Sequence, residues 1–195
     1  YLYVGLFAIL TLMVKEDSSI YLVFIGLFFL FSQSKSKKDI IMSLLLIIIP
    51  IVYFLTMTSF IDHSGDGAMF WRYDNLQAYP DLGALGIPMT IFQNPGYWFA
   101  TMFSPEKIYH LVVILLCLGF IPFLNKRFSY YWLVLPLLIF NLSSIWPYQH
   151  LFGYQYYYGS VTLLIFMLLL AFKDHQTKQT KVKSLTSYGI ALIAL

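Results

Sequence analysis

Long apolar runs constrain this chain more than any other feature of its sequence. A helix needs roughly 20 apolar residues to cross the ~30 Å hydrocarbon core of a bilayer, and it satisfies all of its backbone groups internally. Hydrophobic residues make up 59% of the 195 residues and charged residues only 11%, a balance outside the usual range of soluble domains. The sequence therefore predicts an all-α, polytopic integral membrane protein.

Seven apolar stretches are candidate membrane spans: 1–14, 18–32, 40–58, 108–124, 129–145, 158–172 and 186–195. We expect the first and the last to be truncated, because the sequence starts and stops inside an apolar run. The only long connection, 59–107, is polar and rich in turn-forming residues. We therefore expect one transmembrane domain over 1–195, with 59–107 as an extracytoplasmic loop.

The charged residues divide between the two sides of this seven-span topology. One side has nine of the twelve basic residues and two acids, Asp39 and Asp174, and the other has seven acids and three basic residues. Because basic residues concentrate in cytoplasmic loops, the basic side is predicted to be cytoplasmic. We expect a multi-pass protein of the plasma (inner) membrane, with the lipid bilayer as its partner and no nucleic-acid partner.

Three consecutive charged residues, Lys15, Glu16 and Asp17, separate the first two apolar stretches. As a helix, 18–32 would rise only about 22 Å, so we expect the helix to start near Lys15 and to bring both carboxylates to the membrane boundary. Ionised groups there need partners or water. Lys15 is one candidate partner, and Arg72, a substrate cation or a metal is another.

A second interpretation of this triplet is a helix cap. Acids in a first helical turn interact favourably with the helix dipole, and Ser18 and Ser19 would solvate the helix end. The sequence alone does not decide between a functional site and a helix cap.

Two further polar groups are predicted on the same outer side. The stretch FWRYDNLQAYPDLG, 70–83, contains Arg72, a donor suited to phosphate or carboxylate, and Tyr73 among other aromatic residues. The stretch 143–160 contains His150, a candidate acid, base or phosphate ligand, and Gln155, a candidate ligand of sugar hydroxyls. For both stretches an interfacial aromatic belt is the alternative.

Other motifs give weaker signals. Asp62, His63 and Asp66 have a local, glycine-flanked spacing that is more typical of a turn than of a metal site. Ser104-Pro105 followed by Glu106 and Lys107 indicates a helix start, with His110 one turn on. The single cysteine, Cys117, excludes an internal disulfide and a cysteine metal cluster.

Five stretches, taken in order, resemble one family. They are LTLMVKEDSSIYLVFIGLFFL, RYDNLQAYPDLG, KIYHLVVILLCLGFIPFL, LPLLIFNLSS and YQYYYGSVTLLIF, and together they resemble the polytopic membrane proteins grouped as domain of unknown function 2079. That family looks like a relative of the C-type glycosyltransferase superfold, whose members transfer a sugar from a polyprenyl-phosphate carrier at the extracytoplasmic face. The superfold's acidic first outer loop would lie upstream of Tyr1.

The resemblance implies roles for individual residues. Glu16 and Asp17 would be catalytic carboxylates, one of which deprotonates the acceptor. Lys15, Arg72, Tyr73, His150 and Gln155 would bind substrate, with Arg72 and His150 as candidates for the carrier phosphate. The expected function is transfer of a sugar from a polyprenyl-phosphate donor, with the need for a divalent metal left open. A transporter or flippase of a lipid-linked or anionic substrate, and a non-catalytic scaffold, are the alternatives.

Overall fold

The computed structural model describes residues 1–32, 36–63, 69–125, 127–151 and 154–178. Within these ranges every regular element is helical, as the composition predicts. The α-helices are α1 (Leu2–Leu12), α2 (Ser18–Phe31), α3 (Lys37–His63), α4 (Gly86–Gln93), α5 (Pro95–Met102), α6 (Pro105–Cys117) and α7 (Tyr158–Lys178). The 3-10 helices are η1 (Met69–Leu76), η2 (Pro80–Leu85), η3 (Ile121–Leu124), η4 (Phe128–Leu133), η6 (Pro147–Gln149) and η7 (Gln155–Tyr157), and η5 (Leu137–Leu142) is a π-helix.

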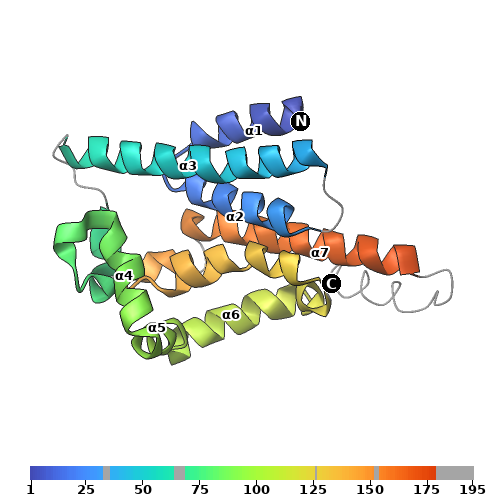
Figure 1. Cartoon of the computed structure of the whole chain (residues 1–195). Helices are drawn as coiled ribbons and strands as arrows, with labels where there is room; N and C mark the ends of the chain where they lie inside the picture. The colour runs from blue at the N-terminus through green and yellow to red at the C-terminus, as the bar shows by residue number, and fades with distance from the viewer. Residues whose placement is uncertain (33–35, 64–68, 126, 152–153, 179–195) are drawn as a thin grey trace.

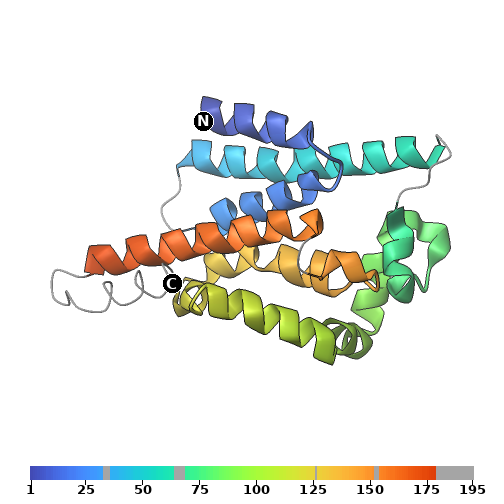
Figure 2. The same cartoon turned by 180° about the vertical axis from the view of Figure 1, so that it is seen from behind.

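The longer helices run side by side as a bundle. Figure 1 shows α1 and α3 along one side, α2 and α7 in the middle and α6 along the opposite side, and the view from behind in Figure 2 agrees. The short helices α4 and α5 gather at the end of the bundle where α3 ends (Figure 1).

Helix length limits which elements can cross a membrane alone. Within the described residues, α3 and the helical stretch Gln155–Asp174 are long and apolar enough, and the pair α5 and α6, bent by 63°, makes a third candidate. The expected span 129–145 is built from η4 and η5 rather than from one α-helix. The expected span 186–195 lies outside the described residues, and the seven-span count stays a prediction.

The loop expected at 59–107 is largely helical. Helix α3 continues past the expected end of its span to His63, and α4, α5 and the start of α6 occupy the second half of the stretch. Proline and glycine made this stretch look like a loop. In the structure Pro95 and Pro105 instead occupy first-turn positions of α5 and α6, where proline is favoured.

The core lies between α2, α6, η4, η5 and α7. It includes Phe28, Tyr130, Leu137, Leu164 and Met167, each at most 5% exposed. Helix α3 packs on α2 from outside this core. A Cβ on Gly26 would lie 2.7 Å from Ile47 Cγ1 and 3.0 Å from the Ser43 carbonyl oxygen. A small residue is therefore needed where these two helices meet, as is common in membrane bundles.

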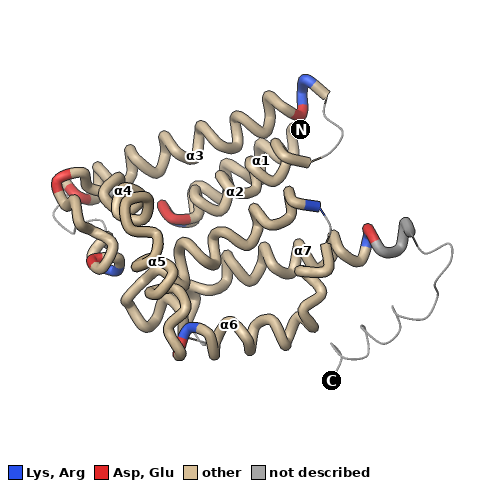
Figure 3. Tube along the Cα trace, turned by 60° about the horizontal axis from the view of Figure 1, so that its bottom comes forward, with Lys and Arg blue, Asp and Glu red and all other residues tan. Residues whose placement is uncertain are grey.

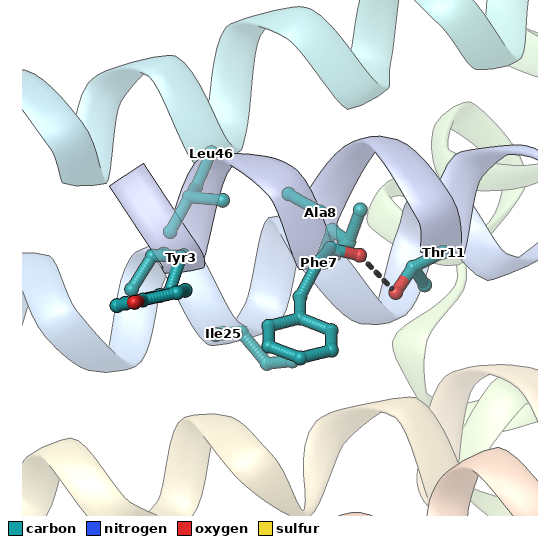
Figure 4. A pocket seen from close by; sticks show the side chains of 8 residues that line it. Tyr3, Phe7, Ala8, Thr11, Ile25 and Leu46 are labelled. Atoms are coloured by element: carbon teal, nitrogen blue, oxygen red, sulfur yellow. Dashed lines mark hydrogen bonds between the residues drawn. The ribbon is translucent and has the colours of Figure 1, made fainter. Parts of the chain in front are cut away.

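The charged residues sit at the two ends of the bundle (Figure 3). We call one end the basic end; there α3 begins, with Lys37, Lys38 and Asp39, and α7 ends after Lys173 and Asp174, the latter paired with Arg127 at 3.1 Å. We call the other the acidic end; it contains the α1–α2 turn with Lys15, Glu16 and Asp17, the end of α3 with Asp62, η1 and η2 with Arg72, Asp74 and Asp81, and the start of α6 with Glu106 and Lys107. The same grouping underlies the predicted topology, and the helices between the two ends are free of charge over most of their length.

Candidate functional site

The Lys15–Glu16–Asp17 triplet forms the turn between α1 and α2 at the acidic end. The Lys15 ammonium lies 2.7 Å from Asp17 Oδ2 and 3.8 Å from Glu16 Oε1. The expected partnership between Lys15 and the two acids is therefore confirmed. Their side chains are 39%, 28% and 26% exposed for Lys15, Glu16 and Asp17, so the triplet is partly buried rather than free in solvent.

The triplet does not cap α2 through its side chains. Asp17 occupies the N-cap position but makes no side-chain cap hydrogen bond. Ser18 Oγ donates to the Thr11 and Lys15 carbonyls, each at 2.6 Å, so the serine closes the turn instead of solvating the helix end. Helix α2 begins at Ser18 and not near Lys15 as expected, because residues 15–17 form i to i+3 turns.

A buried arginine lies beside this turn in an aromatic box made of Trp71, Trp146 and Tyr156. Arg72 is 5% exposed, and its Cζ lies 3.9, 4.8 and 5.7 Å from the ring centroids of Trp146, Tyr156 and Trp71. Cation–π contacts strengthen when the cation is desolvated. The Lys15 ammonium lies 5.5 Å from the centroid of the same Tyr156 ring. Tyr156 therefore joins the triplet to the aromatic box.

Backbone hydrogen bonds hold the aromatic box together across the sequence. The Arg72 carbonyl accepts from Ile145 N at 3.0 Å and from Ser144 Oγ at 2.9 Å, and the same serine oxygen accepts from Trp146 N at 3.1 Å. These bonds fix the loop after η5 against η1. They place Trp146 over the guanidinium.

Tyr73 binds the end of the π-helix rather than facing a cavity. Its hydroxyl donates to the Phe140 carbonyl at 2.9 Å. Burial raises the pKa of the Tyr73 phenol, and the nearby charge of Asp17 adds to this. The phenol is therefore neutral at physiological pH and serves as a donor.

Asn141, fully buried in η5, fixes the two loops that carry the outer polar residues. Its Nδ2 donates to the Gln149 carbonyl at 2.8 Å and to the Tyr156 carbonyl at 3.0 Å, and its Oδ1 accepts from Ser160 Oγ at 2.5 Å. π-Helical turns recur at functional sites. Here the π-helix places one amide between the His150 loop and the aromatic box.

His150 forms a second polar group at the acidic end. It is 3% exposed, its Nε2 lies 3.8 Å from Glu106 Oε2, and its ring centroid lies 6.3 Å from that of His110. Burial lowers the pKa of His150, the positive charge of Lys107 lowers it further, and Glu106 opposes both. His150 is therefore neutral at pH 7, and within the described part of the chain neither ring nitrogen has a hydrogen bond.

Comparison with known families matches residues 2–195 to the family model described as "Predicted membrane protein (DUF2079)". The match covers nearly the whole chain. The chain belongs to this family. Neither the curated proteins nor the solved structures gave a match.

The structure thus brings some of the expected site residues of this DUF2079 member together. Arg72 lies inside the aromatic box, and Lys15, which pairs with Glu16 and Asp17, contacts its Tyr156 ring. Tyr73 follows Arg72 in η1, and His150 lies in the loop that carries Trp146. Gln155 is exposed at the start of η7, and no hydrogen bond among the described residues involves its side chain.

The weaker motifs of the DUF2079 chain have structural explanations. His63 ends α3, with its Nδ1 2.7 Å from the Ser59 carbonyl, while Asp66 lies outside the described residues. No group of three potential metal ligands occurs in the ranges that the structure covers. The helix start at Ser104-Pro105 is confirmed by α6.

Three residues of the site in this DUF2079 chain were not predicted from the sequence. Trp146 and Tyr156 looked like parts of an aromatic belt, and their contact with Arg72 depends on pairing between distant loops. Asn141 carried a detectable signal, because an amide inside an apolar run needs a partner in a membrane protein.

Proposed function

We propose that this DUF2079 member is a multi-pass membrane glycosyltransferase-like protein that transfers a sugar from a polyprenyl-phosphate donor at the extracytoplasmic face. The acidic end is the extracytoplasmic end, and 59–107 belongs to it. The observation that carries the proposal is the buried Arg72 in an aromatic box that shares Tyr156 with the Lys15–Glu16–Asp17 triplet. Cation, carboxylate and aromatic face are thereby combined at one end of the bundle.

The residues fit the separate needs of such a transfer. Arg72 and Lys15 supply positive charge for the carrier phosphate, and the exposed Trp71 and Tyr148 offer flat faces to a sugar ring. In the reaction the bond from the sugar C1 to the phosphate oxygen breaks and a bond from C1 to the acceptor oxygen forms. The acceptor proton passes to a carboxylate, and polyprenyl phosphate leaves.

The two carboxylates have different roles in this proposal. Asp17 contacts Lys15 at 2.7 Å and holds the ammonium in place. Glu16 lies farther from that ammonium, at 3.8 Å, so its carboxylate is the better candidate for the base. The neutral His150 beside Glu106 is a candidate ligand of the phosphate or of the acceptor hydroxyl.

A transporter or flippase of a lipid-linked or anionic substrate is a second candidate, favoured by the broken helix pair α5 and α6. Lys107 lies just after the break, is 5% exposed, and donates to the Thr101 carbonyl at 2.9 Å and to the Leu142 carbonyl at 2.7 Å. Interrupted helices and intramembrane ionisable groups mark substrate pathways in transporters.

One experiment separates the two functions. The intact protein is reconstituted in liposomes with radiolabelled polyprenyl-phosphate sugars and a panel of lipid and glycan acceptors. A transferase converts the donor to free polyprenyl phosphate and a labelled product. A flippase leaves the donor chemically intact but exposes it on the other leaflet. Intact donor on its original leaflet under every condition contradicts both and supports the scaffold.

A further inference from the structure

The segment formed by α4 and α5, Gly86–Met102, is unusual for the polar end of a membrane protein. Between Asp81 and Glu106 the sequence contains no charged residue. The first part of the same expected loop carries Asp62, Asp66, Arg72, Asp74 and Asp81. Such a complete absence of charged residues is not expected of a segment that is surrounded by water.

The α4–α5 segment and the residue after it instead display large apolar side chains on the protein surface. Phe92 is 85% exposed, and Phe99 is 52% exposed. Met89, Tyr97 and Phe103 are 42%, 45% and 42% exposed. In water such a surface would mark an interaction site.

Several polar groups of the segment bind the rest of the protein, while Gln93 and Asn94 at the α4–α5 junction are exposed. Thr90 Oγ1 accepts from Ala78 N at 3.1 Å, and Trp98 Nε1 donates to Ser143 Oγ at 2.7 Å. The Lys107 ammonium donates a hydrogen bond to the Thr101 carbonyl at the end of α5. The segment is therefore anchored through Thr90, Trp98 and the Thr101 carbonyl. Apart from Gln93 and Asn94, its exposed side chains are mainly apolar.

Length excludes a simple crossing by either helix. Each has eight residues, a rise of about 12 Å, and α5 meets α6 at a bend of 63°. Exposed apolar side chains recur in α6 after the exposed Glu106, where Ile108, Val112 and Leu116 are 41%, 40% and 61% exposed.

We propose that the α4–α5 segment is a re-entrant elbow that lies in the lipid bilayer, with Phe92 and Phe99 among the lipid chains. Lipid is the occupant that the observations favour, because the segment has no charged rim for a protein partner and joins the lipid-facing side of a candidate span. The proposed elbow places Gly86–Met102, a part of the expected extracytoplasmic loop 59–107, in the bilayer. It is independent of the proposed glycosyl transfer.

The elbow also sets the depth of the candidate site. Trp98 of α5 binds Ser143, which immediately precedes Ser144, a residue that fixes the Arg72 carbonyl. With α5 in the bilayer, the aromatic box lies near the headgroups, where a lipid-linked substrate reaches it sideways.

Site-directed spin labelling tests this proposal. Single cysteines replace Phe92, Phe99 or the exposed Asp81 in a Cys117→Ala background of the intact protein, which is then reconstituted in liposomes. Phe92 is so exposed that its replacement removes little packing within the protein. Asp81 is the matched control at the same end of the bundle.

The collision rates of each nitroxide with oxygen, which concentrates in lipid, and with a water-soluble nickel chelate are compared. At 92 and 99 we expect the oxygen-to-nickel ratio to exceed that at 81 by about tenfold, equivalent to a partition free energy of about 1.4 kcal/mol. Equal ratios at the three positions would place the segment in water. Protection at 92 and 99 from both reagents would show a covering protein or a second copy. Either result overturns the proposal.

Discussion

The hydrogen bonds of Asn141 predict a large loss of stability when its amide is removed. Asn141→Ala deletes two donated bonds and one accepted bond at a site with no solvent exposure. At about 1 kcal/mol each, the free energy of unfolding should fall by about 3 kcal/mol. Ser160→Ala deletes only one of the three bonds and should cost about 1 kcal/mol.

SDS unfolding in mixed micelles, followed by the fluorescence of the native tryptophans, measures both changes. Asn75→Ala is the matched control, because this partly buried amide makes one long bond of 3.4 Å to the Ser143 carbonyl. In the double variant of Asn141 and Ser160 the two losses should not add, because the residues share a bond. A change of less than about 0.5 kcal/mol for Asn141→Ala, the range of ordinary surface substitutions, would refute the assigned role of the amide.

Three further predictions concern packing, pH and topology. Gly26→Ala should lower stability because its Cβ would lie 2.7 Å from Ile47 Cγ1, whereas Gly5→Ala, with open space around it, should not; equal thermal unfolding temperatures would contradict this. Because the folded pKa of His150 lies below its usual value near 6.5, the unfolded chain binds the proton more readily. The free energy of unfolding should therefore be highest above the unfolded pKa of histidine and should decrease as pH falls toward the folded pKa of His150. A His150→Gln variant with the same pH dependence would exclude His150 as the cause. In a Cys117→Ala background, Asp81→Cys should react with an impermeant maleimide from outside intact cells and Ser36→Cys should not; the reverse pattern would invert the topology.

Properties that depend on local sequence were predictable here. Composition gave the helical class, and the charged residues grouped by side in the sequence lie at opposite ends of the structure. The Lys15–Asp17 ion pair and the helix start at Pro105 were also predicted correctly, because both involve neighbouring residues.

Properties that depend on packing between distant segments were not predictable. Nothing near Arg72 in the sequence indicates Trp146 as its partner. The stretch 129–145 forms 3-10 and π-helices rather than the expected α-helix, because Asn141 of η5 is hydrogen-bonded to the loops around it. The proposed elbow lies in the stretch that the sequence predicts as an extracytoplasmic loop, because its glycines and prolines resemble turn residues. The absence of charged residues between Asp81 and Glu106 is the sequence signal on which the elbow proposal depends.

The proposed glycosyl transfer depends on the carboxylates of Glu16 and Asp17 at the acidic end. The most direct test compares donor consumption by the intact protein, in liposomes with a labelled polyprenyl-phosphate sugar, for Glu16→Gln, Asp17→Asn and Asp39→Asn. Asp39 is the matched control, because its carboxylate lies at the basic end, where it accepts a hydrogen bond from Tyr1 at 2.6 Å. We expect Glu16→Gln to lose consumption by about 10²-fold or more, as for removal of a general base. Asp17→Asn should also lose consumption, because it removes the ion pair that holds the Lys15 ammonium, while Asp39→Asn keeps the rate of the unaltered protein. Undiminished consumption by both acidic-end variants would contradict it.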